Sequence, residues 1–361
     1  MDVSAAQCPE CHQHPGDPVA VETHVVEDIL PPRVQRVKVT QYDLHDYKCQ
    51  HCGHEFSTKH ERCPQVGNIG PALLVYTTML KYHLRGPIRK VQGFLAQYSG
   101  FVISPKGVHD ILLRVAEACR GEYERTLEKV RAARWVHIDE THFDVLGKRL
   151  WLWIFRTDGG DVLVVIRPSR GRKVLKEILG EDFAGAVIAD GWKPYWYIAI
   201  LQRCWSHLIR EVDDFKDASD NGRRLSEEIH AMFKDLKELL AIDPPMEERK
   251  RRKDELDAEM VSLVERYNAS EELEKPVTYI QNGLGHWYTC LLYPGMEPTN
   301  NLGEQAMREH VIMRKIIGCF RSVNGSQAYQ YIASLLATWK LQGKNMFEEL
   351  ERLVVREICL K

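Results

Sequence analysis

The chain has 361 residues, 44% of them hydrophobic, which is enough for two or three domains with buried cores. It has no apolar run long enough to cross a membrane and no basic start followed by an apolar stretch. A membrane protein is therefore excluded, and we expect a cytosolic one. Ten cysteines in a chain of this length do not indicate a disulfide-rich secreted scaffold, and the CxxC pairs among them favour metal binding.

The net charge of −2 conceals a segregation of charge along the chain. Residues 64–134 carry 11 Lys and Arg against 5 Asp and Glu, and residues 299–361 carry 9 against 6. Residues 209–275 carry 13 Lys and Arg against 20 Asp and Glu, and residues 1–63 carry 6 Lys and Arg against 10 Asp and Glu. The basic block at 64–134 is either a surface that faces phosphates or a solvated helical face, and charge alone does not decide between them.

The first segment, residues 1–63, contains two CxxC pairs, which are Cys8 with Cys11 and Cys49 with Cys52. The runs between the pairs are rich in β-formers, so two short hairpins can bring the pairs together. Four thiolates suit tetrahedral Zn²⁺, and a segment this small needs its metal to fold. The spacing predicts a zinc ribbon with a structural Zn²⁺. Its acidic charge leaves a protein-docking role open.

The second segment, residues 64–134, predicts three helices joined by short turns. Two span about 69–83 and 88–98, and the third begins at Ser104-Pro105, a helix-start pair. In the third, apolar residues recur at i, i+3, i+4, i+7, i+8 and i+11 from Val108, which predicts a buried stripe. The pattern fits a helix-turn-helix-like DNA-binding domain, although other small helical bundles look the same.

The third segment, residues 135–361, begins with an alternation of strands and helices. RWVHIDE, RLWLWIFRT and DVLVVIRP predict three strands, GRKVLKEILG a helix, AGAVIADGW a fourth strand and YIAILQRCW a fifth. This order matches a multidomain α/β protein whose catalytic core is RNase H-like, with a mixed five-stranded sheet and helices. Residues 209–275 predict a helical insertion of two charged helices, about 223–241 and 247–267, broken at Asp243-Pro244-Pro245.

Acidic residues end the first and fourth predicted strands. Asp139 closes WVHIDET and Asp190 closes AVIADGW, and in this sheet those two strand ends are neighbours. Glu304 lies in the first turn of a helix that begins after a Thr-Asn-Asn turn. Glu140 points to the opposite face from Asp139 and is the weaker candidate. Three converging carboxylates predict a site for two Mg²⁺ or Mn²⁺ ions that serves phosphodiester chemistry.

HIDET, ADGW, CWSH, TNNLGEQAMR and RKIIGCFRS follow one another in an order that resembles the DDE-type transposases of the insertion-sequence-66 family. The resemblance covers nearly the whole chain. It implies an RNase H-like core in which Asp139, Asp190 and Glu304 hold the catalytic metal ions, and metal-dependent cleavage and strand transfer at insertion-element ends. A leucine-zipper-like N-terminal helix, seen in many members, is missing from this sequence, which ends soon after a helix expected at 326–341.

The resemblance also implies partners. These are double-stranded DNA, both element ends and target, a second copy of the chain or more when assembled on DNA, and possible accessory proteins. A cytoplasmic protein of this kind associates with the nucleoid when it is bound to DNA.

Cys204-Trp-Ser-His207 has the spacing of half a zinc site. No second pair of ligands lies at zinc spacing nearby, so the sequence does not predict a metal there. By the resemblance, His207 contacts DNA or orients the active site. A histidine satisfied at a strand-to-helix junction explains the motif nearly as well.

The helix of Glu304 carries further polar residues that can contact DNA or support the site. Arg308 either holds the Glu304 carboxylate, contacts a phosphate or forms a simple i,i+4 pair. Helix capping explains at least one of Asn300 and Asn301, and either can donate to the DNA backbone. Beyond them, a short basic track predicts phosphate contacts and comprises Arg314, Lys315 and Arg321.

Two other functions remain open from the sequence. One is a transposase-derived DNA-binding protein that no longer cuts, although the retained acids argue against it. The other is a related RNase H-like nuclease or resolvase. Strand transfer scored separately from hydrolysis distinguishes them from a transposase.

Overall fold

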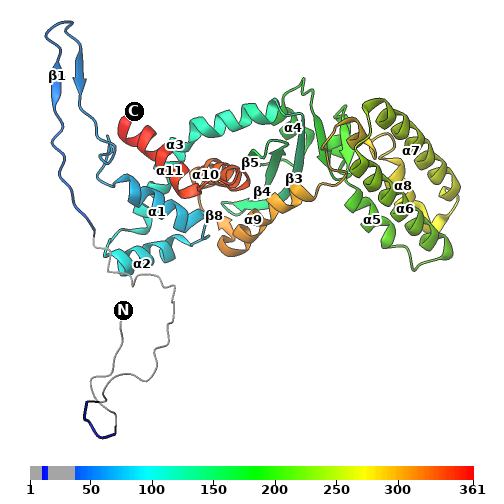
Figure 1. Ribbon diagram of the computed structural model, residues 1–361, viewed down its shortest axis with the longest axis horizontal. Helices are drawn as coiled ribbons and strands as arrows, with labels where there is room; N and C mark the ends of the chain where they lie inside the picture. Colours follow the sequence, from blue (N-terminus) through cyan, green and yellow to red (C-terminus); the bar gives the residue numbers. More distant parts are fainter. Residues whose placement is uncertain (1–9, 15–36) are drawn as a thin grey trace.

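A computed structural model describes residues 10–14 and 37–361. At the N-terminal side, β1 (Asp46–Lys48) and β2 (Glu55–Ser57) pair antiparallel in a small exposed hairpin (Figure 1). The first of the two predicted hairpins, and Cys8, lie outside the described residues. No helix in the described part of the chain is long and apolar enough to cross a membrane.

The central element is a mixed sheet with the order β5-β4-β3-β6-β7. β3, β4 and β5 are antiparallel neighbours, whereas β6 runs parallel to β3 and β7 parallel to β6. The strands are β3 (Trp135–Val145), β4 (Lys148–Thr157), β5 (Val162–Arg167), β6 (Ala186–Ala189) and β7 (Leu201–Arg203). All five predicted strands are confirmed, and the layout is consistent with an RNase H-like core. A sixth, two-residue strand, β8 (Cys319–Phe320), was not predicted and pairs with the end of β3.

The two faces of the sheet bury alternate residues of the same strands, as the period of two requires. On one face, Leu152, Ile154 and Val164 pack towards α10 (Val323–Leu341) in the largest hydrophobic cluster. Side-chain hydroxyls and an amide of α10 also accept hydrogen bonds from backbone N–H groups of β5. On the other face, Trp153, Phe155 and Val165 pack towards α4 (Arg172–Leu179). The sheet is therefore covered on both sides.

The three predicted helices of residues 64–134 are present as α1 (Pro71–Tyr82), α2 (Ile88–Ser99) and α3 (Pro105–Arg131). Ser104 caps α3 by accepting a hydrogen bond from the N–H of Gly107, as expected. The six residues of the predicted stripe are all buried. Their hydrophobic cluster continues into β3, β4, β5 and α10, so the helices share one core with the sheet. The predicted domain boundary at 134/135 thus falls between α3 and β3, but the hydrophobic core continues across it.

A second helical unit extends from the far edge of the sheet (Figure 1). It comprises α5 (Trp205–Asp213), α6 (Asp220–Ile242), α7 (Met246–Tyr267) and α8 (Glu274–Gln281). The predicted helices at 223–241 and 247–267 are confirmed as α6 and α7. The unit is larger than the predicted insertion, because Trp205 and Trp287 on either side of it are fully buried in the same cluster.

The chain then returns to the sheet through α9 (Asn301–Ile317), which packs against β3 and β4. After β8 and α10 it ends in α11 (Met346–Val354) and a turn of π-helix (Val355–Leu360) against α1 and α3. Short one-turn helices complete the fold at Lys193–Tyr197, Glu271–Leu273 and Thr289–Leu292.

Candidate active site

The parallel pair of strands brings the first two predicted acids to one edge of the sheet. His137 of β3 pairs with Ile188 of β6. Continuing that register by two residues places Asp139 level with Asp190. Each carboxylate accepts one backbone hydrogen bond at 2.9 Å through Oδ1, Asp139 from the N–H of Glu140 and Asp190 from that of Trp192. These bonds fix both carboxylates close to the backbone from which they project.

Negative charge accumulates around Asp139. Burial, then the charges of Glu140, Asp190 and Glu304, raise the pKa of Asp139 to about 7 from an ordinary value near 3.8. Among the described residues, the three predicted acids do not bring their oxygens within 4.8 Å of one another, so they are more widely spaced than the ligands of a single ion. The site therefore holds several carboxylates that repel one another and that a cation would relieve.

Glu140 points to the opposite face from Asp139, as predicted, and has a clear structural role. Its side chain is 2% exposed, accepts a 2.8 Å hydrogen bond from Nε of Arg170 and accepts another from the hydroxyl of Tyr195. Burial raises the pKa of Glu140, and the charge of Asp190 adds to the shift. The Arg170 guanidinium lies over the ring of Trp192 at 4.2 Å. Glu140 thus holds the loop that follows Asp190, and Arg170 and Tyr195 are site residues that the sequence analysis missed.

Gly191 allows that loop to pass close to the second helical unit. A Cβ at this position would clash with Nη2 of Arg203 and lie 2.8 Å from the ring of Tyr279. Arg203 is buried, and its guanidinium lies within 5 Å of the ring centres of Tyr279 and Trp287. Any larger residue after Asp190 would have to displace this packing.

Asn300 sets the position of Glu304 by a route other than helix capping. It is the N-cap residue of α9, but its side chain makes no capping hydrogen bond, so the expected capping role is wrong for this residue. Instead Nδ2 donates to the carbonyl oxygen of Ile138 at 2.8 Å, and Oδ1 lies 3.1 Å from Nδ1 of His137. Asn300 is 1% exposed, so burial favours its supporting role over a DNA contact. Asn301 is exposed, and its side chain accepts a hydrogen bond from Ser206.

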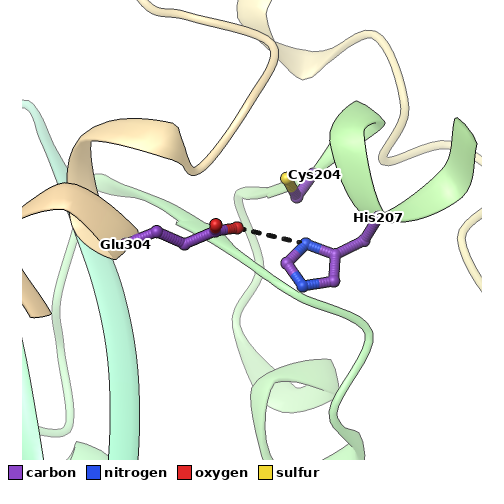
Figure 2. A group of neighbouring side chains, drawn as sticks. All are labelled: Cys204, His207 and Glu304. Atoms are coloured by element: carbon purple, nitrogen blue, oxygen red, sulfur yellow. Dashed lines mark ion pairs between the residues drawn. The ribbon is translucent and has the colours of Figure 1, made fainter. Parts of the chain in front are cut away.

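Glu304 faces His207 rather than Arg308. Nδ1 of His207 lies 3.6 Å from Oε1 of Glu304, and Cys204 completes a group whose three potential ligand atoms all lie within 4.8 Å of one another (Figure 2). Among the described residues this is the one such group of three. The CxxH pair therefore does have a further ligand-type neighbour, which sequence spacing does not reveal because Glu304 lies 97 positions after His207.

Cys204 and His207 shift each other's pKa. Burial alone would raise the pKa of the Cys204 thiol, but the interactions with His207 and with the backbone N–H of Asn300 outweigh burial and lower it. The neighbouring Cys204 side chain raises the pKa of His207, and the charges of Glu304 and Asp190 act in the same direction. Each side chain thus shifts the pKa of the other in the direction of its charged form.

The basic residues of α9 occupy different environments. Arg308 is exposed at a cavity of about 260 Å³, which Arg85, Arg156 and Lys340 also line, and makes no ion pair with Glu304 in the described structure. Arg314 is half-buried and donates to the hydroxyl of Thr141 at 2.9 Å and to the carbonyl oxygen of His142.

Lys315 and Arg321 are exposed. The predicted basic track therefore divides into one residue that holds α9 to β3 and two that remain accessible.

Only part of the predicted four-cysteine zinc site lies within the described residues. Cys49 and Cys52 lie on the turn between β1 and β2, where the N–H of Cys49 donates to His54 and its carbonyl accepts from Gly53. Cys8 lies outside the described residues, so the four-cysteine zinc site stays a prediction. Cys11 does not join Cys49 and Cys52 in a group of ligand atoms within 4.8 Å among the described residues.

A mixed sheet with acids at two adjacent strand ends and a third acid on α9, which packs against β3 and β4, is consistent with an RNase H-like core. The model of the family described as "Transposase IS66 family" matches residues 67–328, and the chain belongs to that family. No curated protein matches the chain. Membership implies a role in DNA transposition, DNA as a partner and dependence on divalent metal ions.

Proposed function

We propose that this chain cuts DNA at insertion-element ends and joins the freed ends to target DNA. Asp139, Asp190 and Glu304 would hold the divalent metal ions. The observation that carries the proposal is the gathering of acids around the buried Asp139: burial first, then the charges of Glu140, Asp190 and Glu304, raise its pKa to about 7. Perturbed groups of this kind concentrate at functional sites.

The donor set fits hard cations. Carboxylate oxygens are the ligands that Mg²⁺ and Mn²⁺ prefer. Bound there, such ions would activate the attacking oxygen and stabilise the leaving oxygen of a phosphodiester.

The chain's own residues would orient these acids. Glu140, held by Arg170, fixes the loop of Asp190, and Asn300 fixes the start of α9 against β3. In the first reaction water would cleave the strand and release a 3′-OH. In the second that 3′-OH would attack a phosphodiester of the target, with no covalent protein–DNA intermediate.

The experiment compares the wild type with Asp139→Asn and Asp190→Asn on labelled element-end DNA, with hydrolysis and joining scored separately in Mg²⁺ or Mn²⁺. Asp158→Asn is the matched control, because Asp158 pairs with the exposed Arg134 rather than with the site. Loss of both reactions in the first two variants alone supports a transposase. Cleavage without joining would indicate a nuclease, and binding without either reaction a derived DNA-binding protein.

We also propose that Cys8, Cys11, Cys49 and Cys52 bind a structural Zn²⁺ and that residues 64–134 contact DNA. Hydrogen bonds from the backbone of Cys52 and His51 lower the pKa of the Cys49 thiol, which favours the thiolate that zinc requires. The zinc content of a Cys52→Ser variant tests the first part. A lower salt dependence of DNA binding after Arg89→Ala tests the second.

A further inference from the structure

Two buried polar atoms face each other at the proposed catalytic site without a hydrogen bond. They are Nδ1 of His207 and Oε1 of Glu304, which form an ion pair with each other but no hydrogen bond among the described residues. Buried polar atoms are normally paired, so each such exception requires an explanation. Their separation of 3.6 Å exceeds the usual length of a hydrogen bond.

The same separation is close to that of two ligands on one metal ion. Nitrogen and oxygen each bound to Zn²⁺ at about 2.0–2.1 Å in a tetrahedral arrangement lie roughly 3.3 Å apart. The sulfur of Cys204 points into the same space from the residue that precedes α5 (Figure 2). Two atoms without a hydrogen bond thus share one space with a third potential ligand.

The elements that carry these residues hold them in place. Cys204 and His207 lie at the N-cap and in the first turn of α5, where a spacing of three residues puts both side chains on one face. The sulfur of Cys204 accepts a 3.1 Å hydrogen bond from the backbone N–H of Asn300, and the Asn300 side chain bonds to β3. Glu304 lies in the first turn of α9, four residues after Asn300. Cys204 is fully buried, while the side chains of His207 and Glu304 are 28% and 31% exposed, so water can reach a fourth position.

We propose that Cys204, His207 and Glu304 bind a Zn²⁺ ion through Sγ, Nδ1 and Oε1, with water as the fourth ligand. A thiolate and an imidazole select zinc over the hard cations that carboxylates alone attract. The second oxygen of Glu304 stays available to the proposed catalytic ions. The zinc ion would tie α9 to α5, and thus the catalytic sheet to the second helical unit. The proposal does not require that the chain cleave DNA.

Metal content is the first measurement. The full-length protein with Cys49→Ser and Cys52→Ser, which removes thiols of the predicted ribbon, is compared with the same protein carrying Cys204→Ser or His207→Ala. Cys290→Ser is the matched control, because Cys290 is equally buried in the second helical unit and, within the described residues, belongs to no cluster of three ligand-type residues. We expect about one equivalent of zinc to be lost with Cys204→Ser and with His207→Ala, and none with Cys290→Ser.

Cobalt substitution reports directly whether a thiolate binds the metal ion. In the background that lacks Cys49 and Cys52, Co²⁺ should show a thiolate charge-transfer band that the Cys204→Ser variant lacks, while far-UV circular dichroism shows that both remain folded. If the background binds no zinc and shows no such band, the proposal is overturned, and Cys204 and His207 only position Glu304. Zinc binding that survives Cys204→Ser would overturn it as well. Neither readout depends on DNA cleavage. Failure of the zinc proposal can therefore be distinguished from failure of the proposed transposase function.

Discussion

Asn300 donates a hydrogen bond to the carbonyl oxygen of Ile138 at 2.8 Å, which joins the start of α9 to the residue before Asp139. Asn300→Ala should lower the free energy of unfolding by about 1–3 kcal/mol, because it leaves buried groups of β3 unpaired. Urea denaturation measures this. Asn301→Ala is the control, because Asn301 is exposed, and should change stability by no more than about 0.5 kcal/mol. Equal effects of the two variants would contradict the role assigned to Asn300.

The shared core of α1 to α3 and the sheet predicts a single unfolding transition. Leu112 of α3 is 2% exposed, so Leu112→Ala should cost about 2–5 kcal/mol. Residues 64–134 contain no tryptophan, so tryptophan fluorescence reports on the rest of the chain. We expect the fluorescence transition to move to lower urea with Leu112→Ala and to stay in place with the exposed Leu84→Ala. An unmoved transition would show that residues 64–134 form an independent domain.

The raised pKa of Asp139 predicts a pH-dependent stability. An acid whose pKa is higher in the folded chain stabilises the fold while it is protonated, and this stability is lost as the pH rises through the folded value, here about 7. Without added divalent metal, Asp139→Asn should therefore gain stability over the wild type between pH 5 and 7, by up to about 1.4 kcal/mol per pH unit.

Thermal unfolding at several pH values measures the difference between these two proteins. Added Mn²⁺ should reverse this difference in stability at pH 8, because only the wild type keeps the Asp139 carboxylate as a metal ligand. A difference that does not vary with pH would count against the accumulation of charge at this site.

Two neighbouring basic residues of α9 should respond differently to mutation. Arg314→Ala should destabilise the fold, because Arg314 bonds to Thr141 and His142 of β3. Lys315→Ala should leave stability unchanged and, if Lys315 contacts a phosphate, reduce the slope of log binding constant against log salt by about 1. DNA titrations at several salt concentrations measure the slope. An unchanged slope would remove Lys315 from the DNA-binding surface.

Local patterns predicted the strands of the sheet, the helices of residues 64–134 and the helical insertion. The strands carry alternating or continuous apolar runs, and Asp139 and Asp190 follow two of them directly, so strand order alone made them neighbours. The role of Asn300 was not predictable in this way. An asparagine before a helix has the same local signature whether it caps the helix or bonds to a distant strand.

The Cys204, His207 and Glu304 group shows the same limit at longer range. Between His207 and Glu304 the chain forms the second helical unit, and only its return to the sheet brings the two residues together. Likewise, an apolar stripe on α3 predicts a buried face but does not say that the sheet covers it.

The most direct test of the central claim is strand transfer by Glu304→Gln, which keeps the shape of the side chain and removes its charge. Glu309→Gln on the same helix is the control, because Glu309 pairs with Arg85 instead. We expect Mg²⁺- or Mn²⁺-dependent joining of element-end DNA to fall by at least about a hundredfold with Glu304→Gln, since loss of outer ligands alone costs 10- to 100-fold, while DNA binding persists. Joining at the wild-type rate in Glu304→Gln would contradict the claim that this carboxylate holds the catalytic metal.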